Sequence, residues 1–128
     1  MLLADIDAQP TVAVKDLERA KAFYGGVLEF EPVGPTMRGV QLYRAGRTVI
    51  VVYESQFAGT NQGTAMTWAL GELFDPVMTE LEGKGVVFEH YDMPHVTRDG
   101  NVHRAGGMGL AWFKDPDGNI IHVNSAGH

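Results

Sequence analysis

Residues 14–30, VKDLERAKAFYGGVLEF, contain the pattern that decides the fold. Asp16 stands where a helix N-cap belongs, because its carboxylate can accept hydrogen bonds from the first free backbone N–H groups. Apolar side chains then recur at helical spacing, which predicts an amphipathic helix. They are Leu17, Ala20, Tyr24, Val27 and Leu28. The alternation TVAV over residues 11–14 predicts a short strand before this helix, and Gly25-Gly26 weaken the helix's last turn.

Three runs typical of strands follow this helix. They cover residues 29–33, 40–43 and 47–53, separated by turns at Gly34-Pro35 and Ala45-Gly46. The stretch VIVVY within the third run is continuously apolar, so we expect that strand to be covered on both faces.

A similar order begins again after residues 58–64, a polar, glycine-bearing stretch that we interpret as a linker. Residues 65–70 predict a strand. Asp75-Pro76 predicts a helix start, with Asp75 as the N-cap and proline at the first helical position. Gly83 or Gly85 ends this helix.

The last third of the chain adds three strands and a long polar segment. The strands are expected over residues 86–90, 108–113 and 119–124, and the turn Asp115-Pro116-Asp117-Gly118 joins the last two. Residues 91–107 predict mainly a loop, with one weak strand near Val102.

The order strand, helix, strands thus occurs twice, which predicts an α+β fold built from two βαβββ modules within one domain. Module one covers about residues 1–57 and module two about residues 65–128. Each half is too small to cover its own sheet well, so the two are expected to pair. The cleft between them is then the natural pocket for a small molecule.

Composition narrows the class of protein. The 128 residues are 45% hydrophobic and carry a net charge of −6 with no basic stripe, which argues against a nucleic-acid partner. No long apolar run or signal peptide is present, so no membrane partner is expected. The chain has no cysteine, which excludes disulfides and thiolate metal sites and fits a cytoplasmic protein.

Two stretches resemble the vicinal oxygen chelate (VOC) superfamily, which holds glyoxalase I, the bleomycin-resistance proteins and the extradiol dioxygenases. They are residues 14–30, quoted above, and residues 111–119, AWFKDPDGN. The repeat between them also matches, so the resemblance covers essentially the whole chain. It implies two βαβββ modules that form a cupped mixed sheet around a cavity, and a homodimer.

Metal-dependent members of this superfamily place four ligands in the cavity. The resemblance assigns these positions to Gln9, Val51, Met66 and His122. Gln9 offers a carbonyl oxygen and His122 an imidazole nitrogen, whereas valine has no donor atom and a thioether prefers soft copper. We therefore expect no metal cofactor. If a divalent metal does bind, His122 and Gln9 would hold it.

The same positions predict an aromatic, apolar lining. Tyr53 shares a strand face with Val51, and Trp68 shares one with Met66. The expected ligand-binding residues are Gln9, Val51, Tyr53, Met66, Trp68 and His122. His122 is either a catalytic base or hydrogen-bonding group toward the ligand, or a histidine hydrogen-bonded within the sheet. Ordinary core packing is favoured for Trp112.

Three further histidines, His90, His95 and His103, lie in or beside the segment 91–107. Their spacing matches no metal motif, which favours a solvated polar loop over a lid or an unconventional metal site. The chain as a whole is expected to bind a small molecule without metal, similar to the bleomycin-resistance branch. The alternative is a glyoxalase- or dioxygenase-like metalloenzyme with a reduced or relocated metal site.

Overall fold

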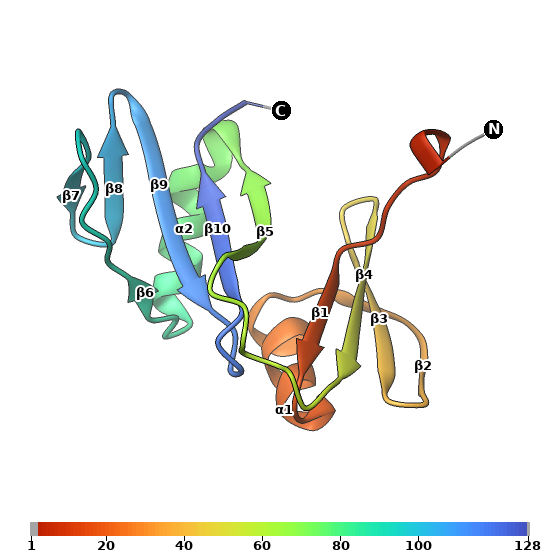
Figure 1. Cartoon of the computed structure of the whole chain (residues 1–128). Coiled ribbons are helices and arrows are strands. Elements are labelled where there is room, and N and C mark those ends of the chain that lie inside the picture. The colour runs from red at the N-terminus through yellow and green to blue at the C-terminus, as the bar shows by residue number, and fades with distance from the viewer. Residues whose placement is uncertain (1–2, 128) are drawn as a thin grey trace. The chain divides into compact units, whose positions relative to one another are not determined.

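A computed structural model describes residues 3–127, which form two compact units that divide between Gly59 and Thr60 (Figure 1). Unit one contains η1 (Leu3–Asp5), β1 (Thr11–Val14), α1 (Leu17–Lys21), η2 (Ala22–Val27), β2 (Glu31–Met37), β3 (Val40–Ala45) and β4 (Thr48–Glu54). Unit two contains β5 (Thr64–Ala69), η3 (Gly71–Leu73), α2 (Phe74–Gly83), β6 (Phe88–Glu89), β7 (Thr97–Asp99), β8 (Val102–Ala105), β9 (Met108–Lys114) and β10 (Ile120–Asn124). The mixed α+β class is as predicted.

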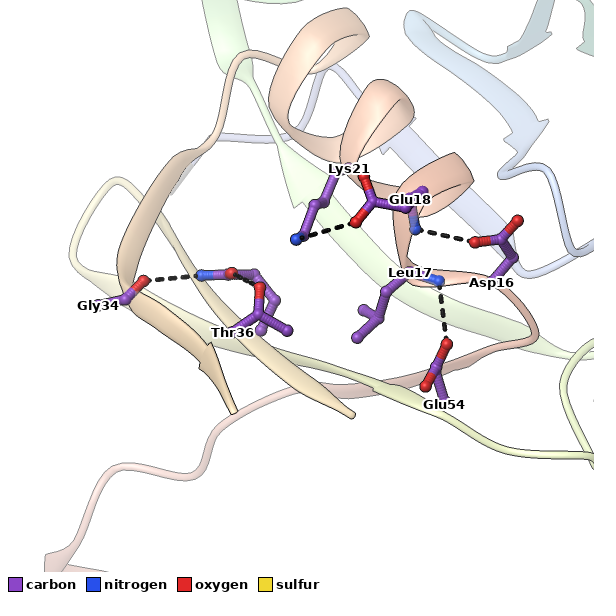
Figure 2. Close-up of polar contacts among 8 residues, drawn as sticks. Asp16, Leu17, Glu18, Lys21, Gly34, Thr36 and Glu54 are labelled. Atoms are coloured by element: carbon purple, nitrogen blue, oxygen red, sulfur yellow. Dashed lines mark hydrogen bonds and ion pairs between the residues drawn. The ribbon is translucent and has the colours of Figure 1, made fainter. Parts of the chain in front are cut away.

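Unit one is a four-stranded sheet in the order β1-β4-β3-β2, with β1 parallel to β4 and the other pairs antiparallel. The predicted N-cap is confirmed, because the Asp16 carboxylate accepts a hydrogen bond from the Glu18 backbone N–H at 2.9 Å. A second carboxylate reaches the same helix start, where Glu54 Oε2 accepts from the Leu17 N–H at 3.4 Å (Figure 2). These acceptors satisfy N–H groups that the first helical turn leaves free.

The first helix widens where the sequence places Gly25-Gly26. From Ala22 to Val27 the backbone is π-helical, and the Leu28 N–H donates to the Phe23 carbonyl at 2.9 Å. Tyr24 is fully buried in this segment and stacks against Phe30, with ring centroids 6.0 Å apart. The widened turn thus still contributes to the core of unit one.

Two predictions for unit one are wrong. Gly34-Pro35 is not a turn but lies inside β2, which is irregular between Val33 and Met37. The buried Gln41 side chain satisfies this irregular backbone: its amide donates to the Gly34 carbonyl at 3.2 Å, and the Thr36 hydroxyl donates to its oxygen (Figure 2). A side chain from β3 therefore replaces the regular ladder bonds.

The central strand β4 is also not covered equally on both faces. Ile50 and Val52 are 1% and 0% exposed, whereas Tyr53 on the alternate face is 36% exposed and Val51 is half-buried. Packing against α1 covers one face only, so the continuous apolar run does not signal two covered faces here.

Unit two repeats the sheet of unit one, in the order β5-β10-β9-β8-β7, with β6 paired to β9. The parallel pair β5–β10 corresponds to β1–β4, and β9 and β8 follow as β3 and β2 do. Helix α2 lies against one face of this sheet (Figure 1). Gly109 permits the close packing, because a Cβ there would lie 2.6 Å from Cε2 of Phe74.

The predicted start of α2 and the predicted loop 91–107 both need correction. The short helix η3 runs directly into α2, so Asp75 lies in the first helical turn and Leu73 occupies the N-cap without a side-chain hydrogen bond. Residues 97–105 form the hairpin β7–β8, in which β8 confirms the weak strand predicted near Val102, while β7 was not predicted. The tight turn at 115–118 is confirmed, with Asp115 Oδ1 accepting from the Asn119 N–H at 2.8 Å.

Within residues 3–127, no helix is long and apolar enough to cross a membrane.

Candidate functional site

The face of the unit-two sheet that α2 leaves uncovered carries most of the unit's half-buried polar and aromatic side chains. On the covered face, Ala111, Phe113, Ile121 and Val123 are all at most 3% exposed. Residues alternate along a strand, so the other face presents Trp112 and His122, which lie directly opposite each other on β9 and β10. Thr67 on β5 lies beside His122. We call this the helix-free face of unit two.

Four rings on this face form a continuous cluster, which we call the aromatic ladder: Tyr91, His103, Trp112 and His122. The Trp112 indole stacks on the His122 imidazole, with centroids 4.5 Å apart and an interplanar angle of 25°. His103 and Tyr91 meet Trp112 edge to face, at 5.0 Å and 5.3 Å. Offset-stacked and perpendicular arrangements are the favourable geometries for such rings.

His122 is held as one neutral tautomer. Its Nδ1–H donates to the Ala111 carbonyl at 2.9 Å, so Nε2 carries the lone pair and accepts from the Asn124 side-chain amide at 3.2 Å. The Asn124 amide is oriented in turn, because its oxygen accepts from the Ala126 N–H at 3.0 Å. Burial lowers the pKa of His122; the bond to Ala111 opposes this shift, and His103 adds to it.

His103 supports the ladder from β8. It is fully buried, and its Nε2 accepts from the Tyr91 backbone N–H at 2.9 Å. Its Nδ1 therefore carries the proton and has no hydrogen-bond partner among the described residues. This bond fixes the chain leaving β6, which brings the Tyr91 ring against Trp112.

An ion pair lies at one end of the helix-free face. Lys114 Nζ lies 3.4 Å from Glu89 Oε1, and Glu89 lies opposite Trp112 in the β6–β9 register. Burial raises the pKa of Tyr91; the Glu89 carboxylate adds to this shift and Lys114 opposes it. Tyr91 is thus a neutral hydroxyl at ordinary pH, and the charges beside it cancel.

The strand register separates two of the expected lining residues from His122. Met66 lies beside Ile121 and Trp68 beside Val123, both on the face that packs toward α2. In this register Met66 and Trp68 do not share a sheet face with His122, and their contact with a ligand stays a prediction. The side chains of β5 on the face of His122 are those of Ala65, Thr67 and Ala69.

The other three expected residues lie in unit one. Val51 is paired with Thr11 and Tyr53 with Ala13, on the face of that sheet opposite its buried core. Gln9 is exposed in the segment before β1, where its backbone carbonyl accepts a hydrogen bond from the Thr11 hydroxyl at 3.0 Å. Val51 and Tyr53 share a face, as the alternation predicted.

The side chains at the assigned metal positions do not fit a divalent cation. Comparison of the two parallel pairs makes Ala65, rather than Met66, the equivalent of Gln9, because Thr11 pairs with Val51 as Thr67 pairs with His122. The set then offers one amide oxygen and one imidazole, with two aliphatic side chains. Among residues 3–127, no cluster of three or more His, Asp or Glu side chains could hold a metal.

The three loop histidines have different environments. His103 belongs to the aromatic ladder, so the favoured interpretation of a solvated loop is wrong for this residue. His90 is exposed and bonded to Asn101, with ring nitrogen and amide oxygen 2.9 Å apart. His95 is exposed, with a backbone φ of +62°.

The central position of Trp112 in the aromatic ladder was not predicted from the sequence, and neither was the position of Tyr91. The signal for Trp112 was present: a hairpin closed at 115–118 places residue 112 opposite residue 122. No comparable signal exists for Tyr91, whose position depends on a side-chain bond from another strand.

Residues 8–123 match the model of the Glyoxalase/Bleomycin resistance protein/Dioxygenase superfamily, and the chain belongs to this family. It is similar in structure to the glyoxalase family protein from Enterococcus faecalis, with a TM-score of 0.71, 16% identity and coverage of 96% of this chain and 99% of that one. No curated protein matches it in sequence.

Two further solved structures are similar. Lactoylglutathione lyase from Agrobacterium tumefaciens has a TM-score of 0.65 and 20% identity, with 92% of this chain and 91% of that chain covered. A variant of the fosfomycin resistance protein FosX from Listeria monocytogenes, complexed with Mn(II) and a dihydroxypropylphosphonic acid, has a TM-score of 0.66 and 14% identity, with 94% and 90% covered. At such identities these likenesses establish the fold, while the site must be argued from its own residues.

Proposed function

We propose that this chain binds a small molecule without a metal ion, similar to the bleomycin-resistance branch of its superfamily, and that the aromatic ladder contacts the ligand. One observation carries the proposal: Trp112 and His122 stack on each other while only half-buried, on a sheet face that no described helix of unit two covers. Flat side chains with a polar tip are typical of small-molecule sites. The poor donor set at the assigned metal positions also favours binding without metal.

The test is binding of an aromatic probe to metal-stripped protein. A Trp68→Phe variant leaves Trp112 as the one tryptophan, so its fluorescence reports on the helix-free face. We expect saturable quenching by 8-anilinonaphthalene-1-sulfonate that a chelator does not change. Trp112→Leu should weaken probe binding, measured by probe fluorescence, by about fivefold or more, because stacking contacts of this kind contribute about 1 kcal/mol or more. Absence of saturable binding to the folded protein would overturn the proposal.

One feature favours a second candidate, the glyoxalase- or dioxygenase-like metalloenzyme. The bond from His122 Nδ1–H to the Ala111 carbonyl is the kind of support that metal-binding histidines have. Elemental analysis of protein purified without a histidine tag distinguishes the two. Near-stoichiometric metal that disappears in His122→Phe would replace the metal-independent proposal with this one.

A homodimer and a cytoplasmic location belong to the same proposal. Leu3 and Ile6 are large apolar side chains exposed near the start of the described chain, as expected of residues that a second copy covers. Light scattering at micromolar concentration should give the mass of a dimer; a monomer would refute this part. Cell fractionation tests the location.

A further inference from the structure

His122 and Asn124 together present one acceptor and one donor at the same point of the helix-free face. The Ala111 carbonyl fixes the His122 proton on Nδ1, and the Ala126 N–H fixes the Asn124 oxygen, so the acceptor Nε2 faces the donor Nδ2. Their separation of 3.2 Å is at the long end of the usual range, and an amide has a second N–H. A group that both donates and accepts can therefore insert between the two atoms, donating to the Nε2 lone pair in place of Asn124 and accepting from Nδ2.

Lys114 is the one charged residue that β5, β9 and β10 place on this face, and Glu89 holds it at 3.4 Å. The hydrogen bonds to Ala111 and Asn124 hold His122 as a neutral ring. On these three strands an anionic ligand would thus meet no free cation next to His122 and Asn124, and a cationic ligand no free carboxylate.

The neighbours of this pair are apolar. Leu110 lies opposite Asn124 and Ile120 precedes His122 by two residues, so both point to the helix-free face beside Trp112. All three side chains are half-buried. They form an apolar surface against which a ring can pack, next to one donor and one acceptor.

From these three observations we infer that the ligand is an uncharged ring compound, a phenol or a cyclic alcohol, whose hydroxyl donates to His122 Nε2 and accepts from Asn124 Nδ2. This rests on the proposed function, because it names the ligand class of the same site. His122 and Asn124 thereby become residues that determine ligand specificity.

Three probes of one size test the inference: 2-naphthol, its methyl ether and 2-naphthoate. Each is titrated at pH 7 into metal-stripped Trp68→Phe protein, with Trp112 fluorescence as the readout. The methyl ether lacks the hydroxyl proton and the carboxylate is charged. We expect 2-naphthol to bind about tenfold more tightly than either, the ratio that one or two neutral hydrogen bonds supply.

Two variants remove the recognition from either side. Asn124→Leu deletes the donor, and His122→Phe deletes the acceptor while keeping a flat ring against Trp112. In His122→Phe the affinity ratio of 2-naphthol to its ether should fall to about one, because the acceptor for the hydroxyl proton is gone. In Asn124→Leu both probes lose the same donated hydrogen bond, so both should bind more weakly while the ratio is kept. The ratio is taken within each folded variant, so a general loss of stability does not change it. The matched control is the Trp68→Phe parent, whose substitution lies on the opposite face of the sheet.

The outcomes separate the two proposals. Equal binding of the three probes, tighter binding of 2-naphthoate, or an unchanged ratio in His122→Phe would overturn the hydroxyl inference and leave the proposed function standing. If none of the probes binds, and 8-anilinonaphthalene-1-sulfonate fails as well, both proposals fall.

Discussion

In unit one Val51 lies opposite Leu42, and at the equivalent place in unit two His122 lies opposite Trp112. Four strands, including the parallel pair, follow the same order in both units, and unit two adds β6 and β7. One sheet thus presents an aliphatic pair and the other an imidazole stacked on an indole. The repeat conserves the scaffold and the covered face, while the helix-free face differs, and this is why we place the ligand-binding chemistry in unit two.

The largest expected effect concerns the covered faces. Gly109 in unit two and Gly39 in unit one are equivalent positions. The Gly109 carbonyl accepts from the backbone N–H of Ser125, directly after β10, and the Gly39 carbonyl accepts from that of Glu54, the last residue of β4. A Cβ on Gly109 would lie 2.6 Å from the Phe74 ring, whereas a Cβ on Gly39 would meet the flexible Glu54 carboxylate at 3.3 Å. Gly109→Ala should therefore cost about 2–3 kcal/mol, from overpacking. Gly39→Ala should cost about 1 kcal/mol, from its positive φ.

Urea denaturation followed by circular dichroism measures both variants. Gly107→Ala is the matched control, because nothing lies within 4 Å of a Cβ there. A cost for Gly109→Ala no greater than that of the control would contradict the packing of α2 described above.

The second prediction converts unit two toward unit one. Trp112→Leu and His122→Val copy Leu42 and Val51 into the equivalent positions. Each single change should destabilise the protein by about 1–3 kcal/mol through lost contacts and a partly filled cavity. The double variant should cost less than the sum by about 0.5–1.5 kcal/mol, the coupling expected of a stacked pair. Strict additivity of the unfolding free energies would mean that the stacking contributes nothing.

How much of this the sequence predicts depends on whether the deciding contacts are local. Asp16 is a cap whose partner lies two residues away, and the 115–118 turn is closed by Asp115, so both were predictable. The face of β5 was not predicted, because the resemblance assigned Met66 to the pocket and only the pairing with β10 sets the register. The turn predicted at Gly34-Pro35 was wrong for a similar reason. The Gln41 side chain, on the neighbouring strand, donates a hydrogen bond to the Gly34 carbonyl and keeps this segment within β2.

The site was predicted in part. His122 was found from the resemblance, and Asn124 shares its face by simple alternation. The ladder required two pieces of information that lie outside local pattern: the pairing of β8 with β9, and the bond from the Tyr91 N–H to His103. Polar residues such as Thr97-Arg98-Asp99 carry little strand signal, so β7 was expected to be loop, and only a weak strand was predicted near His103.

The smallest expected effect is a pH dependence that unit two has and the Val51 position of unit one cannot have. The unfolded chain protonates His122 at its ordinary pKa of about 6.5, whereas burial lowers the pKa in the folded protein. Between these two pKa values the unfolded state binds more protons, so the stability that neutral His122 contributes is complete above about pH 6.5 and is lost as the pH falls. The slope cannot exceed about 1.4 kcal/mol per pH unit, and partial exposure of the ring makes it smaller.

The measurement is the unfolding free energy of the wild type minus that of His122→Val from pH 8 to pH 5. The other four histidines are common to both proteins, so their titration cancels in this difference. We expect the difference to shrink toward low pH. A difference that stays constant or grows would show that His122 is not held as the neutral acceptor on which hydroxyl recognition depends.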